Sequence, residues 1–244
     1  MRPPKDYIIF PLDLPSREEA VAFADLLQDC VGMFKVGLEL FVKAGPDMIA
    51  VIGERTQAPI FLDLKLHDIP ATVERAMTVI ASLGVRFATV HCGENLQMLK
   101  AAVAGSRGEV AVLGVTVLTS VDAADIRRVG YRQAFSDNID ELVLQRASEA
   151  KRAGCAGVVC SGREASLIKS KLGPEFLTVT PGIRPQWSLG QGDDQRRATT
   201  PVQAVRGGSD YLVIGRPIRD ADDPVRAAGM VADEVQEALE QDRR

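Results

Sequence analysis

Histidine, cysteine and tryptophan are scarce in this sequence, and their scarcity excludes several kinds of site. The 244 residues include two histidines, one tryptophan and four cysteines, and no two cysteines form a C-x-x-C pair. Zinc centres of the His/Cys type draw their ligands from closely spaced pairs of these residues, so no such metal site is expected. We expect the cysteines to be reduced and mostly buried, as is usual in the cytoplasm. Cys155 and Cys160 are close enough in sequence for a redox pair, but Cys160 ends an apolar run, which favours a core thiol.

Long hydrophobic runs and an excess of basic charge are also lacking. No apolar stretch approaches the roughly 20 residues that span a bilayer. The apolar run near the start is short and is broken by Pro11, unlike a signal peptide. The net charge is −4, whereas proteins that bind nucleic acids or membrane surfaces normally show a basic excess. We therefore expect a cytoplasmic protein with no nucleic acid or membrane as partner. A small anionic ligand stays open, because local donors hold such ligands.

What the sequence does contain is a regular alternation of apolar and amphipathic segments. Short apolar runs, of the kind buried on both faces of a parallel sheet, occupy residues 7–12, 33–36, 60–64, 87–91, 110–118, 157–160, 176–180 and 211–214. Segments with helical spacing lie between them. Residues 16–29 begin with Ser16 as N-cap and Glu19 as its capping-box partner, and residues 223–241 begin with Asp223 and Pro224.

Strand–helix alternation repeated eight times is typical of a (β/α)8 TIM barrel. The alternative is a doubly wound open sheet, but eight units in about 240 residues favour a closed barrel. We find no repeat, low-complexity tract or linker, so residues 1–244 are interpreted as a single barrel domain.

Polar residues follow most of the predicted strands where each strand ends. In barrels, the catalytic residues lie at these carboxyl ends. A single polar residue there often only caps a helix or faces solvent, but their recurrence at most strand ends favours a site. For His91, at the end of the fourth run, we favour a core position. The residues at the strand ends are Asp13, Lys35, Asp63, Lys65, Asp68, His91, Thr119, Ser120, 181–184, Gly215 and Arg216.

The densest polar group lies in the segment FLDLKLHDIPAT, residues 61–72. Asp63 and Lys65 are two residues apart, so on an extended strand their side chains point to the same face. Asp68 follows three residues later. An ammonium group between two acids is held in one place in its charged form, which suits a proton donor. The alternative is an ion-pair network that only stabilises the fold.

Glycine and arginine near the last strand indicate a phosphate site. Barrels often bind phosphate with the loops after strands 7 and 8. Glycine lets backbone N–H groups approach the anion, and arginine pairs with it. The long polar loop of residues 181–200, with Trp187 near its start, is interpreted as a lid over the ligand. An ordinary turn around the glycines is the alternative. The residues in question are Gly207, Gly208, Gly215, Arg216 and, in the lid, Arg184, Gln195, Arg196 and Arg197.

The segment FLDLKLHDIPATV closely resembles the signature of the orotidine 5′-phosphate decarboxylase family. The likeness continues through LDLPS, KVG, TVLTS, TPGIRP and VIGRPI, in the right order along nearly the whole chain. It implies a carboxy-lyase that converts orotidine 5′-monophosphate to UMP in the last step of pyrimidine biosynthesis, without a cofactor or a metal ion. It also implies a homodimer.

The resemblance implies a role for each matching residue. Lys65 is expected to donate a proton to C6 of the pyrimidine, with Asp63 close to the departing carboxylate. Asp68 and Thr72 are expected to complete the active site of the neighbouring subunit. The other implied contacts are Asp13 and Lys35 at the ribose, Thr119 and Ser120 at the pyrimidine edge, Arg184, Gln195, Gly215 and Arg216 at the phosphate, and Ile69 and Pro181 elsewhere on the substrate. The stretch 187–193 is longer than the family pattern, so the lid contacts match less closely.

Two other interpretations remain open. Related barrels for sugar phosphates share D-x-K-x-x-D and hold Mg²⁺ with an acid at the end of strand 2, where this chain has Lys35; Glu39 lies past that strand. A non-catalytic nucleotide-binding barrel that serves as a sensor or scaffold is the second alternative. Such a protein has no need to keep Lys65 between two acids.

Overall fold

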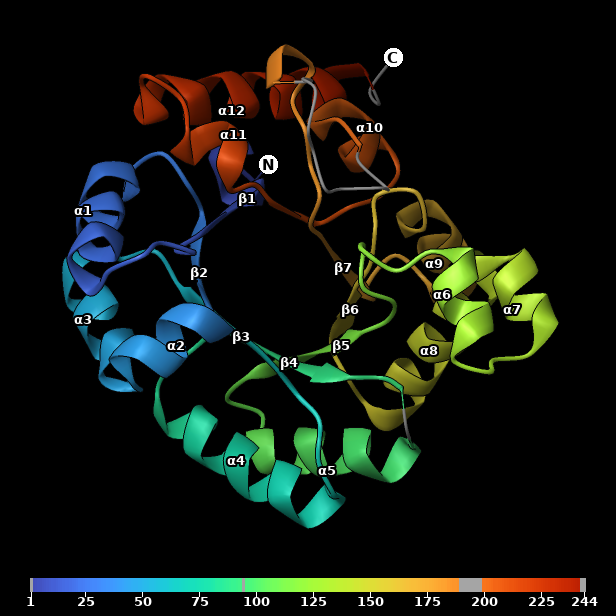
Figure 1. The fold of residues 1–244 in the computed structure, drawn as a ribbon. Coiled ribbons are helices and arrows are strands. Elements are labelled where there is room, and N and C mark those ends of the chain that lie inside the picture. Colours follow the sequence, from blue (N-terminus) through green and yellow to red (C-terminus); the bar gives the residue numbers. More distant parts are fainter. Residues whose placement is uncertain (1, 94, 189–198, 242–244) are drawn as a thin grey trace.

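The computed structural model describes residues 2–93, 95–188 and 199–241. In it, eight parallel strands close into a barrel, where each strand pairs with the next and β8 pairs with β1 (Figure 1). This closure confirms the predicted (β/α)8 barrel and rules out the open sheet. The strands are β1 (Ile8–Pro11), β2 (Met33–Gly37), β3 (Ile60–Leu66), β4 (Phe87–His91), β5 (Ala111–Val115), β6 (Gly157–Val159), β7 (Leu177–Thr180) and β8 (Tyr211–Val213).

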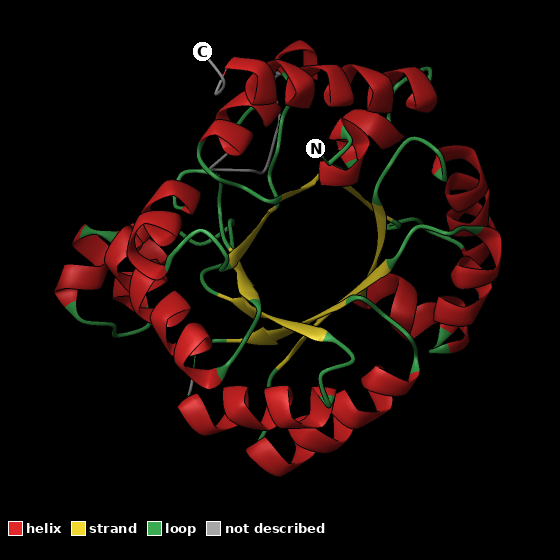
Figure 2. Cartoon of the chain, turned by 180° about the vertical axis from the view of Figure 1, so that it is seen from behind, coloured by secondary structure: helices red, strands yellow, loops and turns green. Residues whose placement is uncertain are grey.

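The helices form a ring outside the strands (Figure 2). Within the described residues, none combines the length and apolar character that a membrane span requires. The helices are α1 (Arg17–Leu27), α2 (Leu38–Ala44), α3 (Asp47–Arg55), α4 (Pro70–Ser82), α5 (Leu96–Ser106), α6 (Ala123–Arg128), α7 (Gln133–Asp137), α8 (Ile139–Ala153), α9 (Ala165–Leu172), α10 (Pro201–Arg206), α11 (Arg216–Arg219) and α12 (Pro224–Gln241), with 3₁₀ turns η1 (Pro4–Tyr7) and η2 (Gln186–Ser188).

The first and last predicted helices begin where their capping residues indicate. Ser16 Oγ accepts a hydrogen bond from the Glu19 N–H at 3.1 Å, and the same hydroxyl donates to the Glu19 carboxylate at 2.9 Å. The second bond differs from a full capping box, in which the Glu19 side chain accepts from the Ser16 backbone N–H. At the last helix, the Asp223 carboxylate accepts from the Arg226 N–H at 3.0 Å. These bonds satisfy N–H groups that the first helical turn leaves without partners.

Two apolar layers hold the barrel together. An inner layer fills the space enclosed by the strands, and a larger layer packs their outer faces against the helices. Because the strands are buried on both faces, they appear in the sequence as continuous apolar runs. The inner layer consists of Ile9, Met33, Phe61, Phe87, Leu113 and Val179.

One predicted strand is too long. Residues 110–118 are predicted as one strand, but β5 ends at Val115. Val115 pairs with His91 of β4 and Val159 of β6, and both are the last residues of their strands. No neighbouring strand remains beyond them to extend the ladder, so the apolar residues Val117 and Leu118 continue as a loop that lines the main cavity.

Candidate active site

A cavity of about 650 Å³ opens at the carboxyl ends of the strands. Parallel strands bring all of these ends to one side of the barrel, so residues far apart in the sequence meet there. Most of the predicted site residues line this single cavity. They are Asp13, Lys35, Asp63, Lys65, Thr119, Ser120, Pro181, Arg184, Gly215 and Arg216.

Four alternating charges form an array along one wall of the cavity. Lys65 Nζ lies 2.8 Å from Asp63 Oδ2. Lys35 Nζ lies 3.7 Å from the same oxygen and 3.0 Å from Asp13 Oδ1. The side chains of Lys35 and Asp63 are only 9% and 12% exposed, whereas that of Lys65 is 35% exposed. The inner pair is therefore fixed within the protein, while the Lys65 ammonium group faces the cavity.

The two lysines determine the charge of Asp63. Burial acts to raise the pKa of the Asp63 carboxyl group, but Lys35, Lys65 and hydrogen bonds from Lys65 and Thr89 outweigh it, so the pKa lies below its ordinary value. The carboxylate is therefore ionised at neutral pH. An ionised Asp63 in turn holds the Lys65 ammonium in place.

Gly37, which the sequence reasoning missed as a site residue, makes room for this array. A Cβ atom at this position would lie 2.6 Å from Asp13 Oδ1 and 2.9 Å from Lys35 Nζ. Any larger residue would therefore displace the ion pair. The signal was present in the KVG motif at the end of the second strand, where glycine follows Lys35 by two residues.

The backbone at Lys65 is not that of a regular strand. Lys65 has φ of +53°, in the left-handed region that residues other than glycine rarely adopt. The pairing of β3 with β4 also shifts register between Leu62 and Leu66. Asp63 and Lys65 do line the same cavity, as predicted from strand alternation, but a bulge directs them there.

Asp68, Ile69 and Thr72 do not line the cavity of their own chain. Asp68 is exposed, and its carboxylate accepts the Ile69 N–H at 2.6 Å. The expectation that Lys65 lies between two acids is thus wrong within one chain, since among the described residues only Asp63 forms an ion pair with it. Ile69 is 65% exposed, although it is apolar.

Among the described residues, three arginines also line the cavity: Arg184, Arg216 and Arg219. Arg219, a second residue that the sequence reasoning missed, follows Arg216 by nearly one helical turn in α11 and donates to the backbone carbonyl of Asp13 at 3.1 Å. A hydrogen bond from Arg219 to Asp220 raises the pKa of its guanidinium group. The predicted lid residues Gln195, Arg196 and Arg197 lie outside the described residues.

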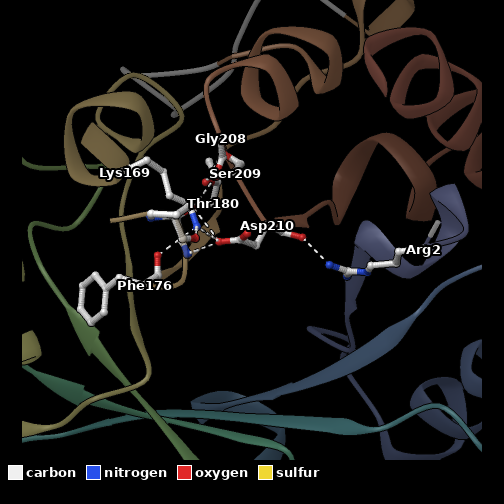
Figure 3. A network of polar contacts seen from close by, with 9 residues as sticks. Arg2, Lys169, Phe176, Thr180, Gly208, Ser209 and Asp210 are labelled. Atoms are coloured by element: carbon white, nitrogen blue, oxygen red, sulfur yellow. Dashed lines mark hydrogen bonds and ion pairs between the residues drawn. The ribbon is translucent and has the colours of Figure 1, made fainter. Parts of the chain in front are cut away.

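Gly207 and Gly208 belong to a different part of the barrel. They precede β8 and therefore lie at the amino ends of the strands, away from the cavity. The Gly208 carbonyl accepts the Thr178 hydroxyl at 2.9 Å, within a polar network around Asp210 (Figure 3). Gly207 is the C-cap of α10, and Gly208, with φ of +91°, forms the turn that follows, so the assignment of these two glycines to a phosphate site is wrong.

His91 does not lie in the core, contrary to the expectation from the sequence. It is half-buried and its ring lies 5.5 Å from that of His67, at a second cavity of about 310 Å³. Burial, followed by the positive charges of His67, Lys65 and Arg146, lowers the pKa of His91. The neutral imidazole is therefore the favoured form at neutral pH.

The cysteines are free thiols, and Cys92, Cys155 and Cys160 are buried as expected, whereas Cys30 is half-buried. Burial raises the pKa of the Cys155 thiol to about 12. A thiol that stays protonated at neutral pH is a poor nucleophile, so this observation disfavours the redox-pair interpretation.

The site also bears on the Mg²⁺-dependent alternative. At the end of β2, where those barrels hold an acid, this chain places the Lys35 ammonium against Asp63 and Asp13. Glu39 is exposed on α2 and does not line the cavity. Across the described residues, no three side chains of the metal-binding types gather as a potential ligand set.

The fold and cavity define a (β/α)8 barrel with a lysine–aspartate site at the carboxyl ends of its strands. The sequence model of the "Orotidine 5′-phosphate decarboxylase / HUMPS family" matches residues 6–231 of this chain. The orotidine 5′-phosphate decarboxylase of Desulfosudis oleivorans is 53% identical over 239 residues, which cover 98% of this chain and 96% of that protein. The enzyme of the same name from Pelobacter propionicus is 48% identical, with 93% and 94% covered.

A solved structure shows the same likeness. The crystal structure of orotidine 5′-phosphate decarboxylase from Lactobacillus acidophilus superimposes with a TM-score of 0.76 at 36% identity and covers 93% of this chain and 98% of that one. The chain belongs to the orotidine 5′-phosphate decarboxylase / HUMPS family. The resemblance found in the sequence motifs is thereby confirmed.

Proposed function

We propose that this protein decarboxylates orotidine 5′-monophosphate to UMP, the last step of pyrimidine biosynthesis, without an organic cofactor or a metal ion. The named relatives support this substrate. The observation that carries the proposal is the Lys65 ammonium, held 2.8 Å from Asp63 and facing the main cavity.

Lys65 performs the chemical step. Cleavage of the bond between C6 and its carboxylate releases CO₂ and leaves an electron pair on C6. A positive charge already fixed at that carbon stabilises the developing anion, because it needs no reorganisation during the reaction. Lys65 then transfers a proton to C6, which yields UMP, and the neutral amine regains a proton from solvent.

Asp63 acts on the carboxylate that leaves. The lowered pKa of Asp63 keeps it ionised, and the substrate carboxylate binds beside it. Two carboxylates in a partly buried site repel each other, and loss of CO₂ relieves the repulsion. Asp63 therefore has two roles, since it also holds the Lys65 ammonium by their ion pair.

The rest of the cavity binds the parts of the nucleotide that do not react. The Asp13–Lys35 pair contacts the ribose hydroxyls, Thr119 and Ser120 contact the pyrimidine edge, and Pro181 lines the same space. Arg184, Gly215 and Arg216 hold the phosphate, together with Gln195 of the lid. Binding energy from the remote phosphate orders the site around the reacting carbon.

The site is completed by a second copy of the chain. Asp68, Ile69 and Thr72 follow the catalytic strand but line no part of their own cavity, and the exposed Ile69 is apolar. In a symmetric dimer these residues enter the partner's cavity.

A mixing experiment tests this shared site. When equal amounts of inactive Lys65→Ala and Asp68→Ala proteins exchange subunits, about a quarter of the active sites are expected to be intact, because half of the dimers are mixed and each mixed dimer has one intact site. No recovery after verified subunit exchange contradicts the shared site.

The loss of orotidine 5′-monophosphate absorbance in the presence of the purified protein tests the proposed function. Turnover that is equal with and without EDTA is expected. Turnover abolished by EDTA favours the Mg²⁺-dependent alternative. Nucleotide binding without any turnover favours the sensor or scaffold.

A further inference from the structure

Thr89 contacts both members of the Lys65–Asp63 pair. It lies in the middle of β4 and is 1% exposed. Its hydroxyl donates to Asp63 Oδ1 at 2.9 Å and accepts the backbone N–H of Lys65 at 2.8 Å. One buried hydroxyl therefore connects the side chain of the first residue to the backbone of the second.

The register of the sheet shows why this position is special. Leu62 pairs with Ala88 and Leu66 pairs with Val90, so Thr89 alone stands opposite residues 63–65 of β3. Bulges of this kind leave backbone groups without ladder partners and often occur beside active sites, where they redirect a side chain. The Thr89 hydroxyl accepts the Lys65 N–H in place of a ladder carbonyl.

The same hydroxyl fixes the orientation of the Asp63 carboxylate. Thr89 occupies Oδ1, which leaves Oδ2 to contact Lys65 Nζ at 2.8 Å and Lys35 Nζ at 3.7 Å. Without the hydroxyl, the carboxylate is free to rotate away from Lys65. The left-handed backbone of Lys65 at φ +53° also loses a hydrogen bond that stabilises it.

We propose that Thr89 is a positioning residue for the decarboxylation: it holds the bulge and the Asp63 carboxylate so that the Lys65 ammonium meets the reacting carbon. This inference rests on the proposed function. Thr89 does not line the main cavity, so it acts through Asp63 and Lys65 and does not itself touch the substrate.

Four variants test the proposal. Thr89→Val removes the hydroxyl at nearly constant shape. Thr89→Ser and Thr89→Ala both lack the methyl group and differ from each other only in the hydroxyl. Thr116→Val is the matched control, because Thr116 is also 1% exposed and its hydroxyl donates only to the Val159 carbonyl, at 2.9 Å. For each variant, kcat, KM and the stoichiometry of UMP binding are measured, the last to count folded sites.

We expect kcat per folded site to fall by about 10²-fold in Thr89→Val and Thr89→Ala, as for a misplaced catalytic group. We expect KM of these two variants to change by less than about threefold, because the phosphate and ribose contacts are intact. For Thr89→Ser and Thr116→Val, we expect both kcat and KM to stay within about threefold of the wild-type values. Equal kcat in the Ser and Ala variants overturns the proposal, as does an equal loss in Thr116→Val. If the wild-type protein itself shows no turnover, it is the proposed function that fails.

Discussion

The two ends of the barrel each hold a lysine–aspartate pair, but the pairs differ in what surrounds them. At the amino end, Lys169 Nζ of α9 lies 2.7 Å from Asp210 Oδ2 and also donates to the carbonyls of Pro174 and Phe176 (Figure 3). The same carboxylate oxygen accepts the Thr178 N–H at 2.7 Å. The protein thus satisfies all three donor sites of the Lys169 ammonium.

At the carboxyl end, the Lys65 ammonium has a different environment. Within the described part of the chain its acceptor is Asp63, and its side chain is 35% exposed toward the cavity, against 15% for Lys169. Its remaining donors are therefore available to a ligand. The protein itself satisfies the Lys169 ammonium, which suits a structural ion pair, whereas the Lys65 ammonium keeps hydrogen-bonding capacity for a ligand, as the proposed function requires.

The largest expected effect comes from removing Lys65. Lys65→Ala should lower kcat by at least about 10³-fold, because both the charge at C6 and the proton donor are lost. UMP binding, measured by calorimetry, should be retained. The control at the other end of the barrel is Lys169→Ala. Its kcat should stay within about twofold of the wild-type value at a temperature where the variant is folded. Unchanged turnover in Lys65→Ala removes Lys65 from the mechanism.

A smaller effect is expected at the phosphate. Arg216→Ala should raise the activation free energy that kcat/KM reports by about 2–4 kcal/mol, the cost of a charge left without its partner in a binding site. Inorganic phosphate and UMP should bind more weakly to this variant. Normal binding of both contradicts the phosphate assignment. The exposed Arg226 on α12 offers a control, since Arg226→Ala removes an arginine that does not line the cavity.

The smallest effect on catalysis is expected at the amino end. Lys169→Met keeps the apolar stem but removes the ammonium, and it should lower the free energy of unfolding by about 1–3 kcal/mol. In a chain of this size, each kcal/mol lowers Tm by roughly 2–4 °C. Asp210→Asn should weaken the same ion pair. A tenfold loss of kcat/KM at a temperature where the variant is folded would show that the two ends are not independent.

The sequence predicts the carboxyl end well because its signals are local. Asp63 and Lys65 are two residues apart, and polar residues at the strand ends mark the cavity once the eight strands are recognised. Gly215 and Arg216 are likewise adjacent to the end of β8. The fold is predictable for the same reason, since buried parallel strands and capped helices have short-range patterns.

The amino end and the bulge are not predictable from such patterns. Lys169 and Asp210 are separated by 41 residues, and nothing near either one in the sequence indicates the other. The shift of register at Thr89 depends on how two strands pair, and an alternating pattern assumes regular pairing. The sequence pattern places Gly207 and Gly208 at the wrong end of the barrel because glycines on either side of a short strand look alike in the sequence.

A crystal structure of the protein with bound UMP tests the central claim most directly. The account predicts that Lys65 Nζ lies within about 3.5 Å of C6 of the pyrimidine, the reach needed for proton transfer. A Lys65 amine well out of reach of that carbon, or a divalent cation in its place, would contradict it.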